Sequence, residues 1–189
     1  MSKGISILVI VVIALLLIII PVTGGYNKLV SLDQSVKASE SNIDTNLQRR
    51  SDLIPNLVQT VKGYATEEKS IFVDIANARA KLGGAQTVPD KANADSQLTS
   101  SLSRLLVVVE KYPDLKANQN FRDLSVALEG TENRVAIARQ DYNTIVGEYN
   151  TKVKRFPNSL IAGIFRFNEK PYYKASAGAT EVPKVDFTK

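Results

Sequence analysis

Apolar residues form one unbroken run near the N-terminus and a stepped pattern over the rest of the chain. Residues 5–20 are apolar apart from Ser6, and no charged residue lies between Lys3 and Lys28. At 1.5 Å per residue, a helix of this length can cross a hydrocarbon core of about 30 Å. A helix on the surface of a soluble domain would show a polar face, and this run has none. The pattern predicts a transmembrane anchor with a flexible collar over residues 1–25.

A cleaved signal peptide is the alternative interpretation of the apolar run. Such peptides usually end in a small-residue site of the Ala-x-Ala kind, and the residues after Ile20 do not have this form. We therefore expect an uncleaved, single-pass anchor in contact with the lipid bilayer. Its orientation stays open, because the α-amino group and Lys3 on one side are balanced by Lys28 and Lys37 on the other.

From Tyr26 onward, apolar residues recur at alternating spacings of three and four, which is typical of long packed helices. The phase continues through Pro55, so the pattern predicts a single kinked helix over residues 26–82, about 85 Å long. The residues of this apolar seam are Leu29, Leu32, Val36, Ile43, Leu47, Ile54, Leu57, Val61, Tyr64, Ile71, Ile75, Ala78 and Leu82.

Gly and Pro residues divide the rest of the chain. Gly83-Gly84 ends the first long helix, and Tyr112-Pro113-Asp114 forms a second turn. Short connections between long amphipathic helices favour antiparallel neighbours, so we expect an all-α, up-and-down antiparallel bundle over residues 26–173. Its further helices are expected over residues 91–111 and 118–154, followed by a short apolar segment over 159–167 and an extended or flexible tail over 174–189.

The short apolar segment after Phe156-Pro157 has two interpretations. In the simpler one, it is a short helix that packs on the end of the bundle. In the other, it makes a contact with the membrane or with a neighbouring subunit. The residues available for such a contact are Leu160, Ile161, Ile164 and Phe165.

Charged residues interrupt the apolar seams of the first and third predicted helices. An unpaired charge inside a bundle costs several kcal/mol, so we expect these groups to form a buried structural network. Arg50, or its neighbour Arg49, is expected to pair with Glu132. Glu68 is expected to pair with Arg139. Glu40 also occupies a seam position.

The composition excludes much of catalytic chemistry. The chain has no His and no Cys, which removes the commonest general base, the commonest metal ligand and all thiolate chemistry. A carboxylate-bridged metal site in a bundle would need His beside Glu, and neighbouring Arg residues would repel a cation. No Gly-rich phosphate loop is present, and no Ser stands out as the partner of a Lys in a nucleophilic pair. We expect no enzyme, and no catalytic, metal-binding or cofactor-binding residue.

The formal net charge of +5 is spread thinly along the chain. Nucleic-acid binding requires clustered Lys and Arg, often with stacking aromatic residues, and neither feature is present. We expect no nucleic-acid partner. The excess of positive charge suits a solvated surface that attracts anionic lipid headgroups.

Several short motifs are distributed over nearly the whole chain, including the block from Gln48 to Leu57 and the pairs Tyr142-Asn143 and Tyr149-Asn150. With these motifs the sequence resembles the LemA family of bacterial membrane proteins. Two positions depart from the family pattern, because Glu40 stands where relatives often have Trp and Glu67 where they often have His. The second departure weakens any metal or proton-transfer role taken from relatives. The family-motif residues are Tyr26, Asn27, Asp52, Pro55, Asn56, Tyr142, Asn143, Tyr149 and Asn150.

The resemblance implies a helical bundle on a single membrane helix in the bacterial cell membrane, and no established biochemical activity. The family includes a protein associated with magnetosome membranes, which implies a role in membrane organisation. It also often occurs beside membrane proteases and stress functions. Some relatives look like lipoproteins with Cys near the position of Gly25, which favours a bundle outside the cytoplasm, although an outside N-terminus is also proposed for the family.

Three functions follow as hypotheses. The first is a non-enzymatic scaffold that forms homo-oligomers at the membrane and organises it. The alternative is a monomeric adaptor or modulator that presents the bundle to a membrane protein partner, such as a protease or an envelope-stress sensor. The third, a hydrolase or metal-dependent enzyme, has little support in the residues.

Overall fold

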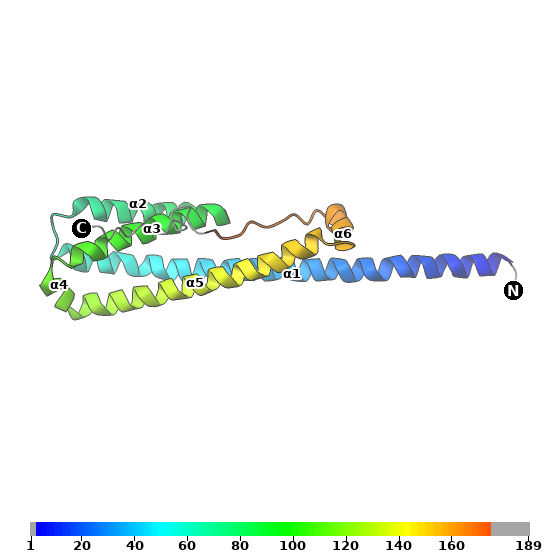
Figure 1. Cartoon of the computed structure of the whole chain (residues 1–189), viewed down its shortest axis with the longest axis horizontal. Coiled ribbons are helices and arrows are strands. Elements are labelled where there is room, and N and C mark those ends of the chain that lie inside the picture. Colours follow the sequence, from blue (N-terminus) through cyan, green and yellow to red (C-terminus); the bar gives the residue numbers. More distant parts are fainter. Residues whose placement is uncertain (1–2, 175–189) are drawn as a thin grey trace, which may run out of the picture. The chain divides into compact units, whose positions relative to one another are not determined.

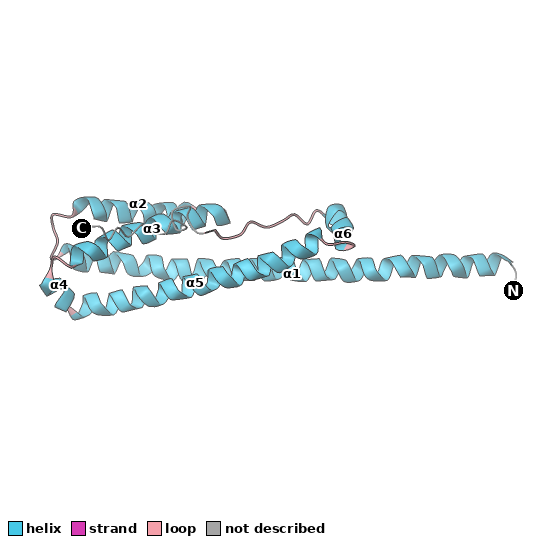
Figure 2. Ribbon diagram, viewed as in Figure 1, coloured by secondary structure: helices cyan, strands magenta, loops and turns pink. Residues whose placement is uncertain are grey.

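The computed structural model describes residues 3–174, and every regular element among them is a helix (Figures 1 and 2). The predicted all-α fold is confirmed, since a long apolar N-terminal helix leads into helices packed as a bundle. Residues 175–189 of the expected tail lie outside the described residues. In chain order the helices are α1 (Lys3–Lys62), α2 (Lys69–Gly84), α3 (Val88–Val109), α4 (Pro113–Ala117), α5 (Gln119–Lys154) and α6 (Asn158–Phe165).

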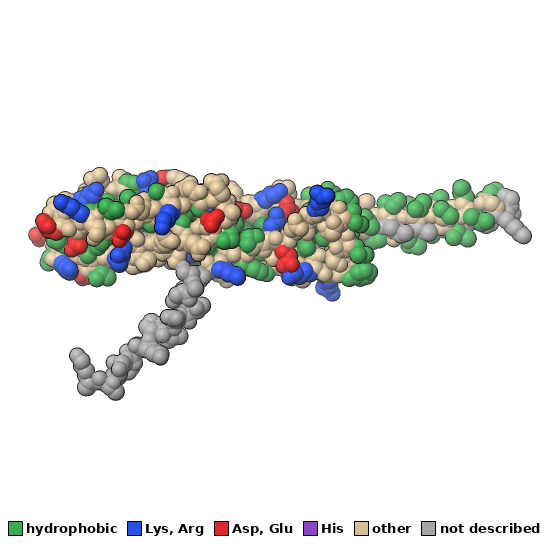
Figure 3. Space-filling view, turned by 90° about the horizontal axis from the view of Figure 1, so that it is seen from above, with side chains coloured by type: hydrophobic (Ala, Val, Ile, Leu, Met, Phe, Trp, Pro, Cys, Tyr) green, Lys and Arg blue, Asp and Glu red, His purple; other side chains and the backbone are tan. Residues whose placement is uncertain are grey.

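The described side chains in the apolar run of α1 are exposed instead of packed (Figure 3). Between Ile5 and Ile20, the large apolar side chains that the structure describes are 44% to 71% exposed. Exposure of this much apolar surface to water is unfavourable by about 25 cal/mol per Å². By length and composition, α1 contains a run that can cross a membrane.

Residues 21–25, expected as a flexible collar, are part of α1. Gly24 and Gly25 differ sharply in their surroundings. A Cβ atom at Gly24 would meet nothing within 4 Å, whereas one at Gly25 would lie 2.5 Å from Ile161 Cδ1 and 2.8 Å from Asn158 Oδ1. Glycine at position 25 therefore permits the close approach of α6 to α1, which is a packing role and not a hinge.

The described chain divides into two compact units, each with its own buried core. Unit 1 contains residues 3–39 and 143–170, and unit 2 contains residues 40–142 and 171–174. In unit 1, residues of α1, α5 and α6 form the core. They are Leu29, Leu32, Val36, Val146, Tyr149, Val153, Ile161 and Ala162.

In unit 1, Arg166 ends α6 with a left-handed backbone conformation, at φ 59°. The Phe167 amide then donates a hydrogen bond to the Ala162 carbonyl at 2.9 Å, as in a helix C-cap. This turn carries Phe167 back toward α1. The ring of Tyr26 lies 4.7 Å from that of Phe165 and 5.8 Å from that of Phe167, measured between centroids.

The expected single helix over residues 26–82 is wrong in one respect, because α1 ends at Lys62 and α2 begins at Lys69. The turn starts at Gly63, where the amides of Tyr64 and Ala65 both donate to the Val61 carbonyl. Ten residues separate Val61 from Ile71, which is close to three helical turns, so the apolar period passes over the turn unchanged. All residues of the predicted seam are buried except Tyr64, which lies in the turn and is 41% exposed.

In unit 2, α2 and α3 pack side by side (Figure 1). Helix α3 begins earlier than expected because the Thr87 side chain accepts a hydrogen bond from the Asp90 amide at 3.2 Å. Pro89 fits in the first turn, where an amide hydrogen is not needed. The expected turn at Tyr112-Pro113-Asp114 leads into the short helix α4.

Candidate functional site: a buried charge network

A buried charge network lies in unit 2, where α1, α3 and α5 meet. Arg50 Nη1 lies 2.7 Å from Asp95 Oδ1, and Arg50 Nη2 lies 2.7 Å from Glu132 Oε2. Arg50 Nη2 also donates a hydrogen bond to Thr99 Oγ1 at 3.0 Å. Arg50 is 2% exposed and Asp95 is fully buried, so both charges are removed from water.

Asp95 is the centre of this network. Its Oδ1 accepts from Arg50, and its Oδ2 forms an ion pair with Arg139 Nη2 and accepts a hydrogen bond from the Tyr173 hydroxyl at 3.3 Å. The Asp95 network is defined here as Asp95, Arg50, Glu132, Arg139 and Tyr173. Two guanidinium groups balance two carboxylates, so the network is close to neutral.

Sequence reasoning missed Asp95, although a signal was present. Asp95 precedes Leu98 by three residues and Leu102 by seven, so it lies on the apolar face of α3. Tyr173 left no comparable signal. It lies outside every described helix, so the spacing of apolar residues along a helix could not indicate that its side chain is buried.

Tyr173 holds the C-terminal part of unit 2 against the network. Its side chain is 6% exposed, and the guanidinium carbon of Arg139 lies 5.0 Å from the centre of its ring. This geometry is a cation–π contact. Burial raises the pKa of the Tyr173 hydroxyl, although the charge of Arg139 opposes the shift. The hydroxyl therefore remains a neutral donor toward Asp95.

Burial also acts on the two arginines. It lowers the pKa of Arg50, an effect that the negative charge of Glu132 partly opposes. Burial likewise lowers the pKa of Arg139. The Nε atoms of Arg50 and Arg139 are buried and have no hydrogen-bond partner within the described part of the chain. Removal of one charge from such a network is destabilising, because it leaves the opposite charge buried with fewer partners.

The network offers little room for other chemistry. Both carboxylate oxygens of Asp95 are occupied by guanidinium groups, which a metal cation would have to displace. Among residues 3–174, no group of three or more His, Cys, Asp and Glu side chains is arranged to hold a metal ion. The arrangement joins α1, α3, α5 and the segment at Tyr173 by complementary charge.

The structure brings together some of the expected residues and separates others. Arg50 and Glu132 are paired, whereas Arg49 is exposed on α1. The expected pairing of Glu68 with Arg139 is wrong. Glu68 is the residue that precedes α2, next to the turn that replaced the continuous helix, while Arg139 pairs with Asp95.

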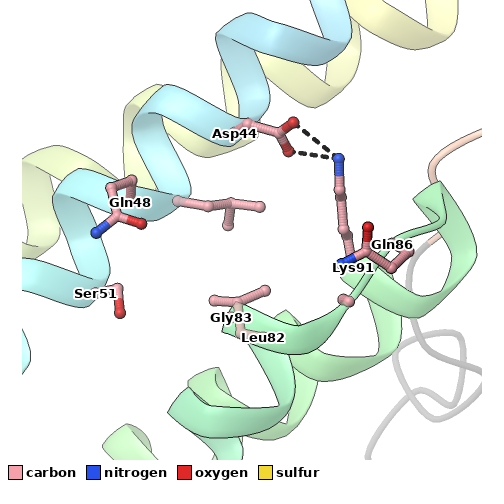
Figure 4. A pocket seen from close by; sticks show the side chains of 9 residues that line it. Asp44, Gln48, Ser51, Leu82, Gly83, Gln86 and Lys91 are labelled. Carbon is pink, nitrogen blue, oxygen red and sulfur yellow. Dashed lines mark hydrogen bonds and ion pairs between the residues drawn. The ribbon is translucent and has the colours of Figure 1, made fainter.

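Glu40 belongs to a second group of charges in unit 2. Lys91 Nζ lies 3.1 Å from Glu40 Oε1. It also lies 2.8 Å from Asp44, on the next turn of α1, and Figure 4 shows this second contact. Burial lowers the pKa of Lys91, but the hydrogen bonds to Asp44 and Glu40 outweigh this effect and raise it. Asp44 and Lys91 line a recess of about 310 Å³. Its other lining residues are Leu47, Gln48, Ser51, Leu82, Gly83, Ala85 and Gln86.

The motif around Pro55 has a local structural explanation. Proline has no amide hydrogen, so the Ser51 carbonyl, four residues earlier, lacks its usual helical donor. Arg79 Nε of α2 donates to this carbonyl at 3.1 Å and to the Ser51 hydroxyl at 3.0 Å. In the same motif, Asp52 accepts a hydrogen bond from Gln48 at 2.7 Å and Asn56 is exposed. The arginine allows α1 to continue through the proline.

The tyrosine and asparagine motifs of α5 hold the segment that follows α6. In unit 2, the Tyr142 hydroxyl donates to the Pro171 carbonyl at 2.9 Å. In unit 1, Asn150 accepts from the Lys170 amide at 2.8 Å and donates to the Lys170 carbonyl at 2.9 Å. Of the other motif residues in unit 1, Tyr149 is buried and lies under Lys170 Nζ, Asn143 is partly buried and Asn27 is exposed.

The four residues named for a membrane or subunit contact are divided between two sides of α6. Ile161 is 5% exposed and faces Gly25 of α1. Leu160, Ile164 and Phe165 are exposed. The simpler interpretation of the segment, a short helix packed on α1, describes Ile161 but leaves the exposed side of α6 unexplained.

Comparison with known proteins finds relatives that align with most of this chain. The chain is similar to magnetosome protein MamQ 2 of Paramagnetospirillum magneticum, with 26% identity over 94% of this chain and 75% of the relative. It is similar to magnetosome protein MamQ of Magnetospirillum gryphiswaldense, with 25% identity over 83% of this chain and 68% of the relative. Protein LemA of Metamycoplasma hominis is 25% identical over 86% of this chain and 73% of the relative.

A model of the LemA family matches residues 39–187, which include all the residues of the Asp95 network and the motif around Pro55. The match begins after the apolar run of α1. Since it extends over much more than half of the sequence, the chain belongs to the LemA family.

Proposed function

We propose that this protein is a membrane-anchored, non-enzymatic scaffold that associates with copies of itself and organises the membrane in which it is anchored. The observation that carries the proposal is the continuity of α1. One uninterrupted helix contains the exposed apolar run and also contributes Leu29 to the core of unit 1 and Ile54 to that of unit 2. A bundle built directly on its membrane helix is suited to ordering a bilayer.

Two further observations support the scaffold. The Asp95 network is a closed set of ion pairs that fixes helix positions, which suits a structural role. The MamQ relatives are named as magnetosome proteins, and we extend to this chain a role at a membrane. For self-association, unit 2 offers the exposed apolar side chains Val107, Val126 and Ile137, which are 69%, 69% and 59% exposed.

Cross-linking through introduced cysteines tests this proposal. The sequence contains no cysteine, so each variant has a single reactive thiol. Single variants Val107→Cys, Val126→Cys and Ile137→Cys are treated in membranes with a short bifunctional thiol reagent. A scaffold is expected to give dimers or ladders at one or more of these positions. The matched control is Gln86→Cys, at an exposed polar position between α2 and α3.

Light scattering of the full-length protein in mild detergent gives the second measurement. A defined assembly larger than one chain is expected. A monomer in detergent, together with no cross-linked species at any of the three positions, would contradict self-association. The monomeric adaptor for a membrane protein would then be the better description.

A further inference from the structure

Helix α6 carries an apolar surface that no other part of the described chain covers. Its eight residues contain no charged side chain. Leu160 is 61% exposed, Ile164 is 75% exposed and Phe165 is 49% exposed, while Phe156, just before the helix, is 75% exposed. Leu160 and Ile164 are four residues apart and therefore lie on one face of the helix.

The place of α6 along α1 suggests what covers this surface. On its buried side, Ile161 and Asn158 lie against Gly25, and Phe165 contacts the ring of Tyr26. A span that starts at Ile5 and rises 1.5 Å per residue crosses about 30 Å of hydrocarbon by the region of Gly25. Tyr26 then lies at the depth where aromatic rings concentrate in membrane proteins, and α6 lies beside it.

Positive charges flank α6 in the sequence and in unit 1. Lys152, Lys154 and Arg155 precede it, and Arg166 follows it directly. The acidic residue of the same stretch, Glu169, is paired with Lys154 at 2.7 Å. An apolar helix flanked by an excess of cations is the arrangement expected at an anionic headgroup layer, where the apolar side chains enter the interface and the charges remain at its surface.

We propose that α6 is a second membrane contact, which lies in the interfacial layer of the bilayer beside the end of the α1 span and prefers anionic lipids. The proposal rests on the membrane anchoring of α1. A second copy of the chain is a poorer occupant of this surface. A helix of this length is about 12 Å long, whereas a stable protein interface buries about 800 Å² on each partner.

The chain contains no Trp, so a single Trp reports on one position. Full-length variants Leu160→Trp and Ile164→Trp are reconstituted in vesicles that contain phosphatidylcholine brominated either high or low on the acyl chain. Leu15→Trp, in the apolar run of α1, measures insertion of the anchor. Val73→Trp, at an exposed apolar position of α2, is the matched control for a surface Trp.

The expected result is a shift of the Leu160→Trp and Ile164→Trp emission to shorter wavelength, with stronger quenching by the shallow bromines than by the deep ones. Leu15→Trp is expected to be quenched most strongly by the deep bromines, and Val73→Trp by neither. Quenching of Leu15→Trp without quenching at either α6 position would overturn the α6 contact and leave the anchor intact.

Two other outcomes would also refute the proposal, each in a recognisable way. Absence of quenching at Leu15→Trp would show that α1 is not inserted, and the anchoring and the α6 contact would fall together. A shift of emission at both α6 positions without quenching by lipid would show that protein covers this surface, as in a contact between copies.

The preference for anionic lipid is tested with the same reporters. Replacing part of the unbrominated phosphatidylcholine by phosphatidylglycerol, at a constant amount of brominated lipid, is expected to increase quenching at Leu160→Trp. The added substitutions Arg155→Gln and Arg166→Gln are expected to abolish this increase without changing the quenching of Leu15→Trp. An equal response to neutral and anionic vesicles would refute the lipid preference.

Discussion

The guanidinium of Arg79 compensates for the amide hydrogen that Pro55 lacks. Its Nε donates to the carbonyl of Ser51, 3.1 Å away, which a residue other than proline at position 55 would satisfy within the helix. Helix α1 thus continues through a proline because α2 supplies the missing donor.

This relationship predicts a coupling between positions 79 and 55. Arg79→Ala is expected to lower the free energy of unfolding by about 1 kcal/mol, the usual worth of such a hydrogen bond. In a Pro55→Ala background the loss is expected to be smaller, because the new amide then bonds to Ser51. A double-mutant cycle by chemical denaturation in mild detergent measures the difference, and strictly additive effects would contradict this account.

The Asp95 network predicts opposite results for two neighbouring arginines. Arg50→Met is expected to lower the free energy of unfolding by about 3 kcal/mol, because Glu132 loses its guanidinium partner and the buried Asp95 keeps only Arg139. Arg49→Met is the matched control, and its expected effect is within about 0.5 kcal/mol since the side chain is exposed. Denaturation curves of the two variants decide the point. Similar curves would show that the network does not stabilise the bundle.

Glu132→Gln tests the second carboxylate of the network. The side chain of Glu132 is 36% exposed, so solvent screening reduces the expected loss to about 1 kcal/mol. The midpoint of thermal unfolding is the measurement. An unchanged midpoint would show that Glu132 does not contribute to the stability of the network. It would not bear on the pairing of Arg50 with Asp95.

The ring and the hydroxyl of Tyr173 make contacts that substitution can separate. Tyr173→Phe keeps the ring under Arg139 and removes the hydroxyl from Asp95, with an expected loss of about 1 kcal/mol. Tyr173→Ala removes both, with an expected loss of about 3–5 kcal/mol. Limited proteolysis near Pro171 should become faster in the same order. Equal behaviour of the two variants would show that the hydroxyl carries the whole effect.

Tyr142 predicts a loss of stability at alkaline pH. Burial, assisted by the negative charge of Glu40, raises the pKa of Tyr142 from 10.0 to about 12. Above pH 10 the unfolded chain loses this proton and the folded chain keeps it, so stability falls until the folded hydroxyl ionises as well near pH 12. The expected loss over this range is about 2–3 kcal/mol.

Unfolding measured from pH 9 to pH 12 tests this account of Tyr142. Tyr142→Phe should flatten the profile, although it also lowers stability at neutral pH by loss of the hydrogen bond to Pro171. Tyr172→Phe, at a side chain that is 42% exposed, is the control for removal of a hydroxyl. An unchanged alkaline profile in Tyr142→Phe would assign the loss to other groups.

Gly24 and Gly25 form a matched pair. Gly25→Ala places a Cβ against the side-chain ends of Ile161 and Asn158, which have to move, and is expected to destabilise the contact of α6 with α1 by about 1 kcal/mol or less. Gly24→Ala meets no atom within 4 Å and is expected to be neutral or slightly stabilising in the helix. Amide hydrogen exchange of α6 measures the difference, and equal exchange in both variants would show that the close contact is not needed.

Much of the fold could be predicted from the sequence because it depends on local periodicity. The apolar run of α1, the alternating spacing of the seam and the Gly and Pro punctuation define an all-α bundle with an apolar N-terminal helix. The same phase placed Arg50 and Glu132 on inward faces of their helices. Periodicity is a property of one segment at a time, and these features need no knowledge of its neighbours.

Tertiary structure decided which inward residues meet. The apolar spacing did not reveal the turn at residues 63–68, because Val61 and Ile71 stay in phase across it. As a result of this turn Glu68 lies just before α2, and Arg139 pairs with Asp95 instead. Asp95 became the centre of the network, and Tyr173 joined it, because packing brought α3 and the end of unit 2 to the same place. The sequence of a single helix shows which of its faces is apolar. Which residues pack against that face depends on how all the elements pack together.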